Sequence, residues 1–179
     1  MIAAHAVLRA ATTDNHQQVD AAFAHFDLAD RRSYGVFLRA HARVLGAIEP
    51  ALIDGPAGFP QVSTRLDHLT SDLAGLAIPW PDLVPLRGPF NAAALWGMLY
   101  VAEGSRLGGG VLAARVGGAM PRRYLAAVHG KGEWRAVLMA LDAAAADRPQ
   151  AWHDHMIDGA RRTFDLYTHS AAVDRPALA

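Results

Sequence analysis

The sequence contains no cysteine. Disulfides, thiolate-bound metals, iron–sulfur clusters and haem attached through thioether bonds all need cysteine, so this chain can supply none of them. Charge of one sign is not in excess either, because 17 basic and 17 acidic side chains give a formal net charge of zero. Without a broad basic field to attract phosphates, we expect no nucleic-acid partner.

Long apolar segments are also missing. No run of 18 or more uncharged apolar residues occurs, so the sequence predicts no membrane-spanning segment and no membrane partner. The N-terminal residues, Met1 to His5, lack a basic segment followed by a long apolar stretch, which argues against a signal peptide. We therefore expect a cytoplasmic protein.

The residues that are present favour a globular helical domain. Hydrophobic residues make up 52% of the 179 residues and charged residues 19%, which is enough apolar material for a core. Apolar residues recur at helical spacing, and no segment shows the alternation of a strand. We predict one all-α domain over residues 1–179, a helical bundle, with a frayed tail from about residue 171.

Capping residues and prolines set the expected helix boundaries. Ser33 is the expected N-cap of the second helix and Pro50 its end, while Asn91 is the expected N-cap of a long apolar helix. Four prolines between Pro79 and Pro89 predict an extended connection. The expected helices cover residues 4–26, 33–50, 66–76, 91–116, 133–146 and 149–170.

His16 is the first candidate for chemistry. It lies among apolar residues of the first helix, with Asp20 one turn later. A metal-bound imidazole needs an acceptor for its other nitrogen, and a carboxylate four residues on can provide one. The alternative is a histidine that is bonded to a carbonyl in the core or simply lies on the helix surface, and spacing alone favours that alternative.

A glycine-rich segment interrupts the long apolar helix. Gly104, Gly108, Gly109 and Gly110 fall within seven residues, and each glycine inside a helix costs about 1 kcal/mol relative to alanine. Such a loss of helix stability is expected where the backbone must bend or lie directly against a flat ligand. A plain turn between helices remains an alternative. A phosphate-binding loop is disfavoured, because no Lys-Ser/Thr follows and no strand precedes the segment.

Two segments together resemble biliverdin-producing haem oxygenases, most closely the bacterial type found beside bacteriophytochromes. Leu8 to His16 (LRAATTDNH) resembles the proximal-helix signature of that family, and Tyr100 to Gly109 (YVAEGSRLGG) resembles its distal-helix signature. Weaker similarities occur at Phe37-Leu38 with Glu49, at Asp72-Leu73, and from Ala160 to Phe164, so the resemblance spans nearly the whole chain.

The resemblance implies haem b between the first, proximal helix and a glycine-kinked distal helix. His16 is then the iron ligand, and Asp20 stands where the family usually has a glutamate, one methylene longer, so its direct contact with His16 is in question. Gly104, Gly108 and Gly109 match the glycines that let the distal helix lie against haem.

The resemblance also assigns the residues around the rest of the haem. Arg9, Lys131 and Arg135 match basic positions that bind the propionates, with ordinary surface charges as the alternative. Tyr100 is expected near a propionate or in the core, and Phe164 is expected to pack near the pocket. Ser105 stands where some members carry an aspartate that organises water. A hydroxyl cannot carry that negative charge, so proton delivery is expected to run differently here.

The implied activity is oxidative opening of haem to biliverdin, with release of CO and iron. It uses O2 and electrons from an external donor, either a ferredoxin or a reductase, and a biliverdin-using bacteriophytochrome is an expected partner. The main alternative is a non-enzymatic haem binder for storage or sensing. A thiaminase-like enzyme is disfavoured by the absence of cysteine, and a di-iron protein by the absence of paired Glu-x-x-His motifs.

Overall fold

The computed structural model describes residues 3–86 and 90–174. The described residues form helices and loops, without a strand, which confirms the predicted all-α fold class. The helices are α1 (Ala4–Ala11), α2 (Thr13–Phe23), α3 (Arg31–Ile53), α4 (Leu66–Gly75), α5 (Ala92–Gly104), α6 (Gly109–Arg115), α7 (Arg123–Ala126), α8 (Glu133–Ala145) and α9 (Gln150–Val173).

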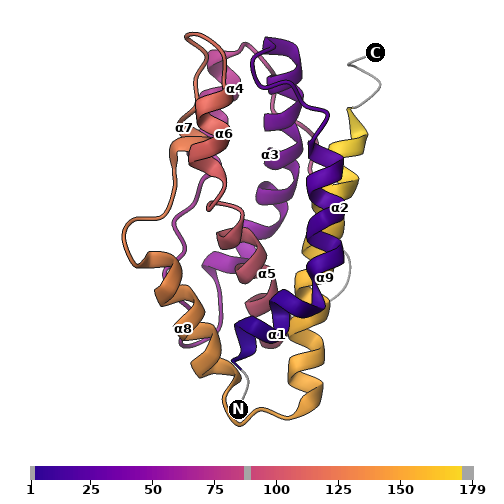
Figure 1. Ribbon diagram of the computed structural model, residues 1–179, viewed down its shortest axis with the longest axis vertical. Coiled ribbons are helices and arrows are strands. Elements are labelled where there is room, and N and C mark those ends of the chain that lie inside the picture. The colour runs from indigo at the N-terminus through magenta and orange to yellow at the C-terminus, as the bar shows by residue number, and fades with distance from the viewer. Residues whose placement is uncertain (1–2, 87–89, 175–179) are drawn as a thin grey trace.

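The bundle is organised around α9, which runs along the long axis beside α2, α3 and α5 (Figure 1). Helices α5 and α9 approach so closely that a Cβ on Gly97 would overlap the backbone of Met156, and one on Gly159 the backbone of Ala94. Leu45, Met98 and other fully buried side chains fill the core around this crossing. The close crossing brings α5 into the middle of the molecule.

The predicted first helix is two helices. It breaks at Thr12, whose φ and ψ are −119° and 11°, and the Thr12 hydroxyl donates to the Leu8 carbonyl at 2.8 Å. The change of direction between α1 and α2 is visible in Figure 1. Helix α2 also ends at Phe23, three residues before the expected end.

The predicted boundaries of the second helix are wrong at both ends. Asp30 caps α3 by accepting from the Ser33 amide at 2.7 Å, while the Ser33 hydroxyl accepts from the Asp27 amide instead. Pro50 lies inside α3, which continues to Ile53. Burial of Leu52 in that last turn, worth about 1.5–3 kcal/mol, offsets the roughly 3 kcal/mol that proline costs a helix.

Asn91 caps α5 as predicted, because its side chain accepts from the Ala94 amide at 2.9 Å. The short helix α7 was not predicted. The expectation of a frayed tail is wrong for residues 171–174, since α9 reaches Val173 and Asp174 pairs with Arg39 and Arg43 on α3. Residues 175–179 of that tail lie outside the described residues.

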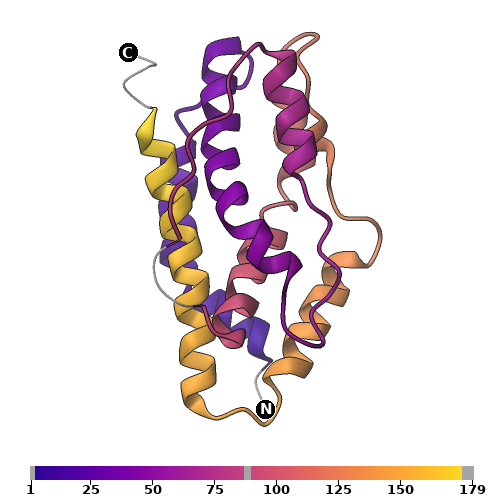
Figure 2. The ribbon, with the colours of Figure 1, turned by 180° about the vertical axis from the view of Figure 1, so that it is seen from behind.

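The connection after α4 runs beside α3 and α9 without helical structure in its described part, residues 77–86, as its prolines predict (Figure 2). Residues 87–89 of the predicted connection lie outside the described residues. In the described part of the chain, no helix combines the length and the apolar character needed to cross a membrane.

Candidate active site

A cleft of about 550 Å³ lies among α2, α3, the α5–α6 break, α8 and α9. This volume is within the range of about 300–1,000 Å³ that is typical of small-molecule sites. Most of its walls are apolar or aromatic, from Val19, Phe23, Phe26, Leu28, Phe37, Val101, Leu107, Leu112, Trp134 and Phe164. The cleft therefore suits a large, flat and mainly apolar ligand.

Helix α2 places His16 at this cleft. Its side chain is 64% exposed, and the His16 ring packs edge-on against Phe164 with 5.9 Å between ring centroids. Asp20 Oδ2 lies 3.1 Å from His16 Nδ1. The shorter carboxylate thus reaches the imidazole directly, and with Nδ1–H donated to Asp20, Nε2 keeps a lone pair for a metal.

The break between α5 and α6 forms another wall. Gly104 and Gly108 both line the cleft. A Cβ on Gly108 would have no described atom within 4 Å, and one on Gly104 would meet only the Trp134 ring, at 3.6 Å. Backbone without side chains therefore borders the open space of the cleft here.

Gly109 faces away from the cleft. It is buried, and a Cβ built on it would lie 2.5 Å from the carbonyl oxygen of Leu125. Gly109 lets α6 pack against α7, whereas Gly104 and Gly108 leave space at the cleft. The glycines of one motif therefore have different structural positions.

Ser105 lines the cleft and belongs to a polar group behind it. Its hydroxyl donates to the Ala102 carbonyl at 2.7 Å and accepts from Arg65 Nη1 at 3.1 Å. Arg65 is 4% exposed and also donates to Ala102, and its guanidinium lies 3.8 Å from Glu49. A buried positive charge thus stands directly behind the serine hydroxyl.

Two further polar side chains line the cleft beside this group, His41 and Tyr167. His41 Nδ1–H donates to the Phe37 carbonyl at 2.9 Å, and burial lowers the pKa of His41 to about 4, so this ring is neutral near pH 7. Burial raises the pKa of the Tyr167 hydroxyl, which lies beside Ser105 and Arg65 without a well-directed hydrogen bond.

The predicted propionate residues come from α1, α5 and the segment around the start of α8, and Arg9, an exposed residue of α1, does not line the cleft. Tyr100 lines the cleft and packs against Trp134, with 5.6 Å between ring centroids. Burial raises the pKa of the Tyr100 hydroxyl, and the nearby Arg9 charge lowers it in part. Lys131 and Arg135 flank Trp134 as exposed side chains and do not line the cleft.

Several lining residues were not predicted from the sequence. Arg115, on the last turn of α6, is the basic side chain that lines the cleft among the described residues. His41, Tyr167 and Trp134, which line the cleft, and Arg65, which lies behind Ser105, were also missed. Phe37-Leu38, quoted as a weak similarity, was the one local signal near His41, while Arg65 stands in a loop without a pattern.

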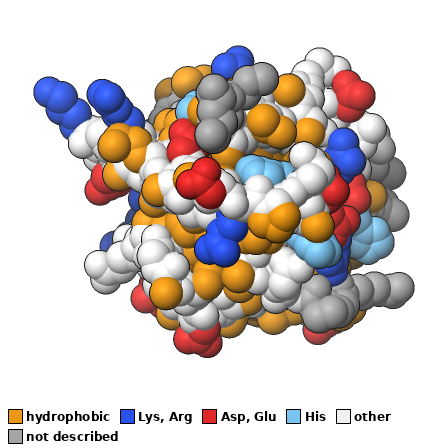
Figure 3. All heavy atoms as spheres, turned by 90° about the horizontal axis from the view of Figure 1, so that it is seen from below, with side chains coloured by type: hydrophobic (Ala, Val, Ile, Leu, Met, Phe, Trp, Pro, Cys, Tyr) orange, Lys and Arg blue, Asp and Glu red, His pale blue; other side chains and the backbone are white. Residues whose placement is uncertain are grey.

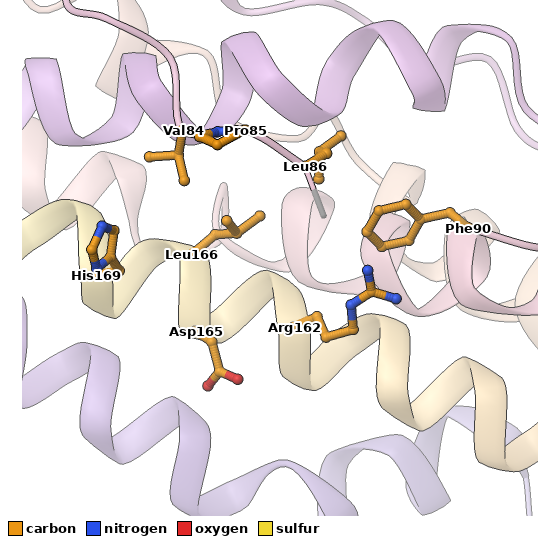
Figure 4. Close-up of a pocket in the computed structure, with 8 residues that line it drawn as sticks. All are labelled: Val84, Pro85, Leu86, Phe90, Arg162, Asp165, Leu166 and His169. Atoms are coloured by element: carbon orange, nitrogen blue, oxygen red, sulfur yellow. The ribbon is translucent and has the colours of Figure 1, made fainter. Parts of the chain in front are cut away.

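A second cavity, of about 350 Å³, lies on the opposite side of α9 (Figure 4). Leu166 points toward Val84 and Leu86, and the Arg162 guanidinium lies 4.1 Å from the Phe90 ring centroid. None of the predicted site residues lines it. Helix α9 thus separates this cavity from the cleft, to which it contributes Phe164 and Tyr167.

The charges on the molecular surface give no sign of a large single-sign patch at the end that Figure 3 shows. Basic, acidic and histidine side chains are interspersed there with hydrophobic ones.

Among the described residues, no three His, Cys, Asp or Glu side chains come together as a metal site.

Comparison with solved structures identifies the fold to which this architecture belongs. The chain matches the crystal structure of the NO- and CO-bound heme oxygenase from Neisseria meningitidis with a TM-score of 0.77 and 26% sequence identity, over 96% of this chain and 91% of that one. The chain has the haem oxygenase fold. The resemblance predicted from the two motifs is thereby confirmed.

A sequence relative agrees with the haem oxygenase fold. A protein named heme oxygenase from Xanthomonas campestris pv. campestris (strain 8004) is 40% identical over 89 residues, which cover 47% of this chain. The match spans about half of the relative's length, 53%. No protein-family model matches the chain.

Proposed function

We propose that this protein is a haem oxygenase, which opens haem to biliverdin with release of CO and iron. One observation carries the proposal. His16 from one motif and Gly104 and Gly108 from the other, about ninety residues away in sequence, line the same cleft of a haem oxygenase fold. The structural neighbour itself is a heme oxygenase crystallised with NO and CO.

The residues of the cleft fit haem as the substrate. Aromatic and aliphatic walls match the porphyrin faces, the exposed His16 imidazole lies at the cleft, and the glycine wall leaves room for a flat ring. The chain has no cysteine for a thioether link, so haem in this proposal is held without covalent attachment. Haem b is the form that the resemblance to the family implies. When bound, haem supplies both the iron that binds O2 and the ring that is oxidised.

His16 and Asp20 form the proximal side in this proposal. Asp20 accepts the Nδ1 proton and orients the ring, so that Nε2 is the iron ligand. A carboxylate bonded to the far nitrogen also makes a ligating imidazole more basic. Phe164 supports the ring from the neighbouring helix α9 through its edge-on contact.

Gly104, Gly108 and Ser105 form the distal side. Gly104 and Gly108 would border a bound haem with backbone alone, so that a small ligand of the haem would be restricted by backbone and not by side chains. The Ser105 hydroxyl proton is engaged by the Ala102 carbonyl, so the oxygen of Ser105 is available mainly as an acceptor that can order water. Arg65 places a positive charge behind the Ser105 oxygen. Tyr167, beside Ser105, provides a hydroxyl group that can donate a hydrogen bond to such a water.

The propionates are assigned to the cleft mouth. Arg9 is near enough to Tyr100, which lines the cleft, for its charge to act on the Tyr100 hydroxyl, and Lys131 and Arg135 lie on either side of Trp134 in sequence around the start of α8. A long lysine or arginine side chain can turn toward a bound carboxylate, and a charge-assisted hydrogen bond contributes about 1.5–3 kcal/mol when sheltered from water. Arg115 is an additional candidate, because it lines the cleft already.

Electrons must come from outside this protein, because nothing in the chain resembles a flavin or nicotinamide site. We propose an external ferredoxin or reductase as donor, a cytoplasmic location, and a biliverdin-using bacteriophytochrome as recipient of the product.

Gly109 belongs to the distal side in this proposal although it faces away from the cleft. Its close packing on the Leu125 backbone supports the wall that Gly104 and Gly108 form.

The deciding experiment is a haem titration followed by addition of reductant under air. A haem oxygenase shows saturable binding with a histidine-ligated spectrum, then loss of the haem spectrum with formation of biliverdin, CO and free iron. Stable haem after reduction, with binding intact, would instead identify a haem-binding protein for storage or sensing. No saturable binding would remove both functions.

A further inference from the structure

The break between α5 and α6 leaves backbone carbonyls without their usual helical partners. In a continuous helix, Glu103 O would accept from the Leu107 amide. Instead the Leu107 amide donates to Gly104 O at 3.1 Å, and the Arg106 amide donates to Glu103 O at 3.1 Å. The geometry of the break therefore depends on which groups outside the helix satisfy and hold the freed carbonyls.

Ala102 O is held by two side chains already described, those of Ser105 and Arg65. Glu103 O is held by a third, His129, whose Nε2–H donates to it at 3.0 Å. His129 belongs to the loop between α7 and α8 and is only 7% exposed. The same loop is tied to the break by Arg106, which donates to Ala127 O at 3.1 Å.

The surroundings fix the imidazole of His129 in this place. Its Nδ1 lies 3.6 Å from the Glu133 carboxylate, and that carboxylate accepts from the Gly130 amide at 2.7 Å. The ring also packs against Trp134, with 5.8 Å between centroids. Trp134 in turn stands 3.6 Å from the position that a Cβ on Gly104 would take.

We infer that His129 is a positioning residue for the distal wall of the cleft. It does not line the cleft and so does not touch the ligand. By holding Glu103 O, it sets where Gly104 and the residues after it pass along the cleft. Resting on the proposed function, this inference makes the bond between His129 and Glu103 a determinant of which edge of the haem ring is opened.

Two substitutions separate the hydrogen bond from the packing of the ring. His129→Phe keeps an aromatic ring beside Trp134 but removes the donor, whereas His129→Gln keeps an N–H group at similar reach but removes the ring. His155→Phe, at an exposed position on α9, is the matched control for loss of a histidine. Hydrogen exchange of residues 103–109 in the ligand-free proteins and the ratio of biliverdin isomers after turnover are measured for each.

The expected result is faster exchange of residues 103–109 in His129→Phe, by up to about tenfold, the equivalent of one net hydrogen bond, because Glu103 O keeps only the Arg106 amide as donor. Its product should spread over more than one biliverdin isomer. His129→Gln and His155→Phe should match the parent in both measurements. This pattern would support a positioning role that acts through the donor.

Three results would overturn the inference: parental exchange in His129→Phe, equally fast exchange in His129→Gln, or faster exchange in His129→Phe with an unchanged isomer ratio. The last would mean that the bond stabilises the loop without placing the wall. If the parent forms no biliverdin, the proposed function fails. The exchange of the ligand-free proteins still decides whether His129 holds the break.

Discussion

Asp20 Oδ2 lies 3.1 Å from His16 Nδ1, one helical turn along α2, although both side chains are largely exposed. The contact orients the imidazole before any ligand arrives and directs its other nitrogen to the cleft. It also answers the question of reach raised by the shorter side chain of aspartate.

His16→Ala should abolish histidine ligation of haem and leave the fold intact. His16 is exposed, so its removal creates no cavity in the core, and the melting temperature of the ligand-free protein should stay within about 2 °C of the parent. The haem-bound spectrum should change and should be restored by external imidazole. A parental spectrum in the variant would assign the ligand to another residue.

Asp20→Asn should weaken the bond between imidazole and iron without removing it. The amide oxygen still accepts from Nδ1–H but carries no charge, so the imidazole becomes a weaker electron donor to iron. Haem affinity should fall about tenfold, the low end of the range for hydrogen-bond partners of a metal ligand. Resonance Raman spectroscopy of the ferrous protein should show a lower iron–histidine stretching frequency. Asp14→Asn on the same helix is the control, and an equal effect there would contradict the assignment.

Gly108 and Gly109 should respond oppositely to the same substitution. Gly108→Leu adds a side chain to open space at a right-handed helical φ of −81°, so the ligand-free protein should melt like the parent while turnover falls by tenfold or more. Gly109→Leu drives its Cβ against the Leu125 backbone. Overpacking of about 1–3 kcal/mol should lower its melting temperature by roughly 3–10 °C.

Thermal melts of the ligand-free variants and turnover with ascorbate or ferredoxin as reductant check this pair. Full turnover in Gly108→Leu would show that no ligand passes along that wall. An unchanged melt in Gly109→Leu would show that α6 and α7 separate easily.

Replacing Lys131 and Arg135 together with alanine should change haem orientation more than haem affinity. Both side chains are exposed and near the start of α8, where turning toward a propionate would fix the rotation of haem in its plane. Paramagnetic NMR of the haem methyl groups should reveal additional orientations, and the product should contain more than one biliverdin isomer. Unchanged orientation and unchanged affinity would leave both as surface charges, and Arg115→Ala would then be the next variant.

Stability of the ligand-free protein should fall with acidity because of His41. Its pKa is lowered from 6.5 to about 4 by burial, so the unfolded chain binds a proton more readily than the folded protein below pH 6.5. Above pH 6.5 the ring is neutral in both states, and His41 does not lower the stability. As the pH falls from 6.5 to 4, the unfolded chain takes up the proton and the free energy of unfolding decreases, by on the order of 3 kcal/mol in total.

Urea unfolding at several pH values between 4.5 and 7.5 measures this dependence. In His41→Gln the free energy of unfolding should depend less steeply on pH than in the parent. The difference between the two slopes belongs to His41, because both proteins share the other titrating groups. Equal slopes in parent and variant would contradict the burial of a neutral imidazole at this position.

Local sequence patterns were sufficient for the helical class and for most helices. His16, Gly104 and Gly108 were assigned to a haem site only through the resemblance to a family, because spacing alone favoured an ordinary histidine and left a plain turn open for the glycines. Helical periodicity, the Asn91 cap and the cost of four clustered glycines act over neighbouring residues, so they can be recognised without knowing the fold. The boundaries that failed lie at Thr12, Asp30 and Pro50. At Thr12 and Asp30 side-chain hydrogen bonds accompany the observed boundary, and beyond Pro50 burial of Leu52, which depends on the packed core, continues the helix.

Only the tertiary structure placed Arg65 behind Ser105, His41 and Tyr167 beside them, and His129 on Glu103 O. These residues come from separate helices and loops, and their contacts depend on how α3, α5 and α9 pack. It likewise separated Gly109 from Gly108, which adjoin in sequence but face different surroundings. Helices form from local spacing, whereas the polar contacts of the cleft exist only after distant segments have packed together.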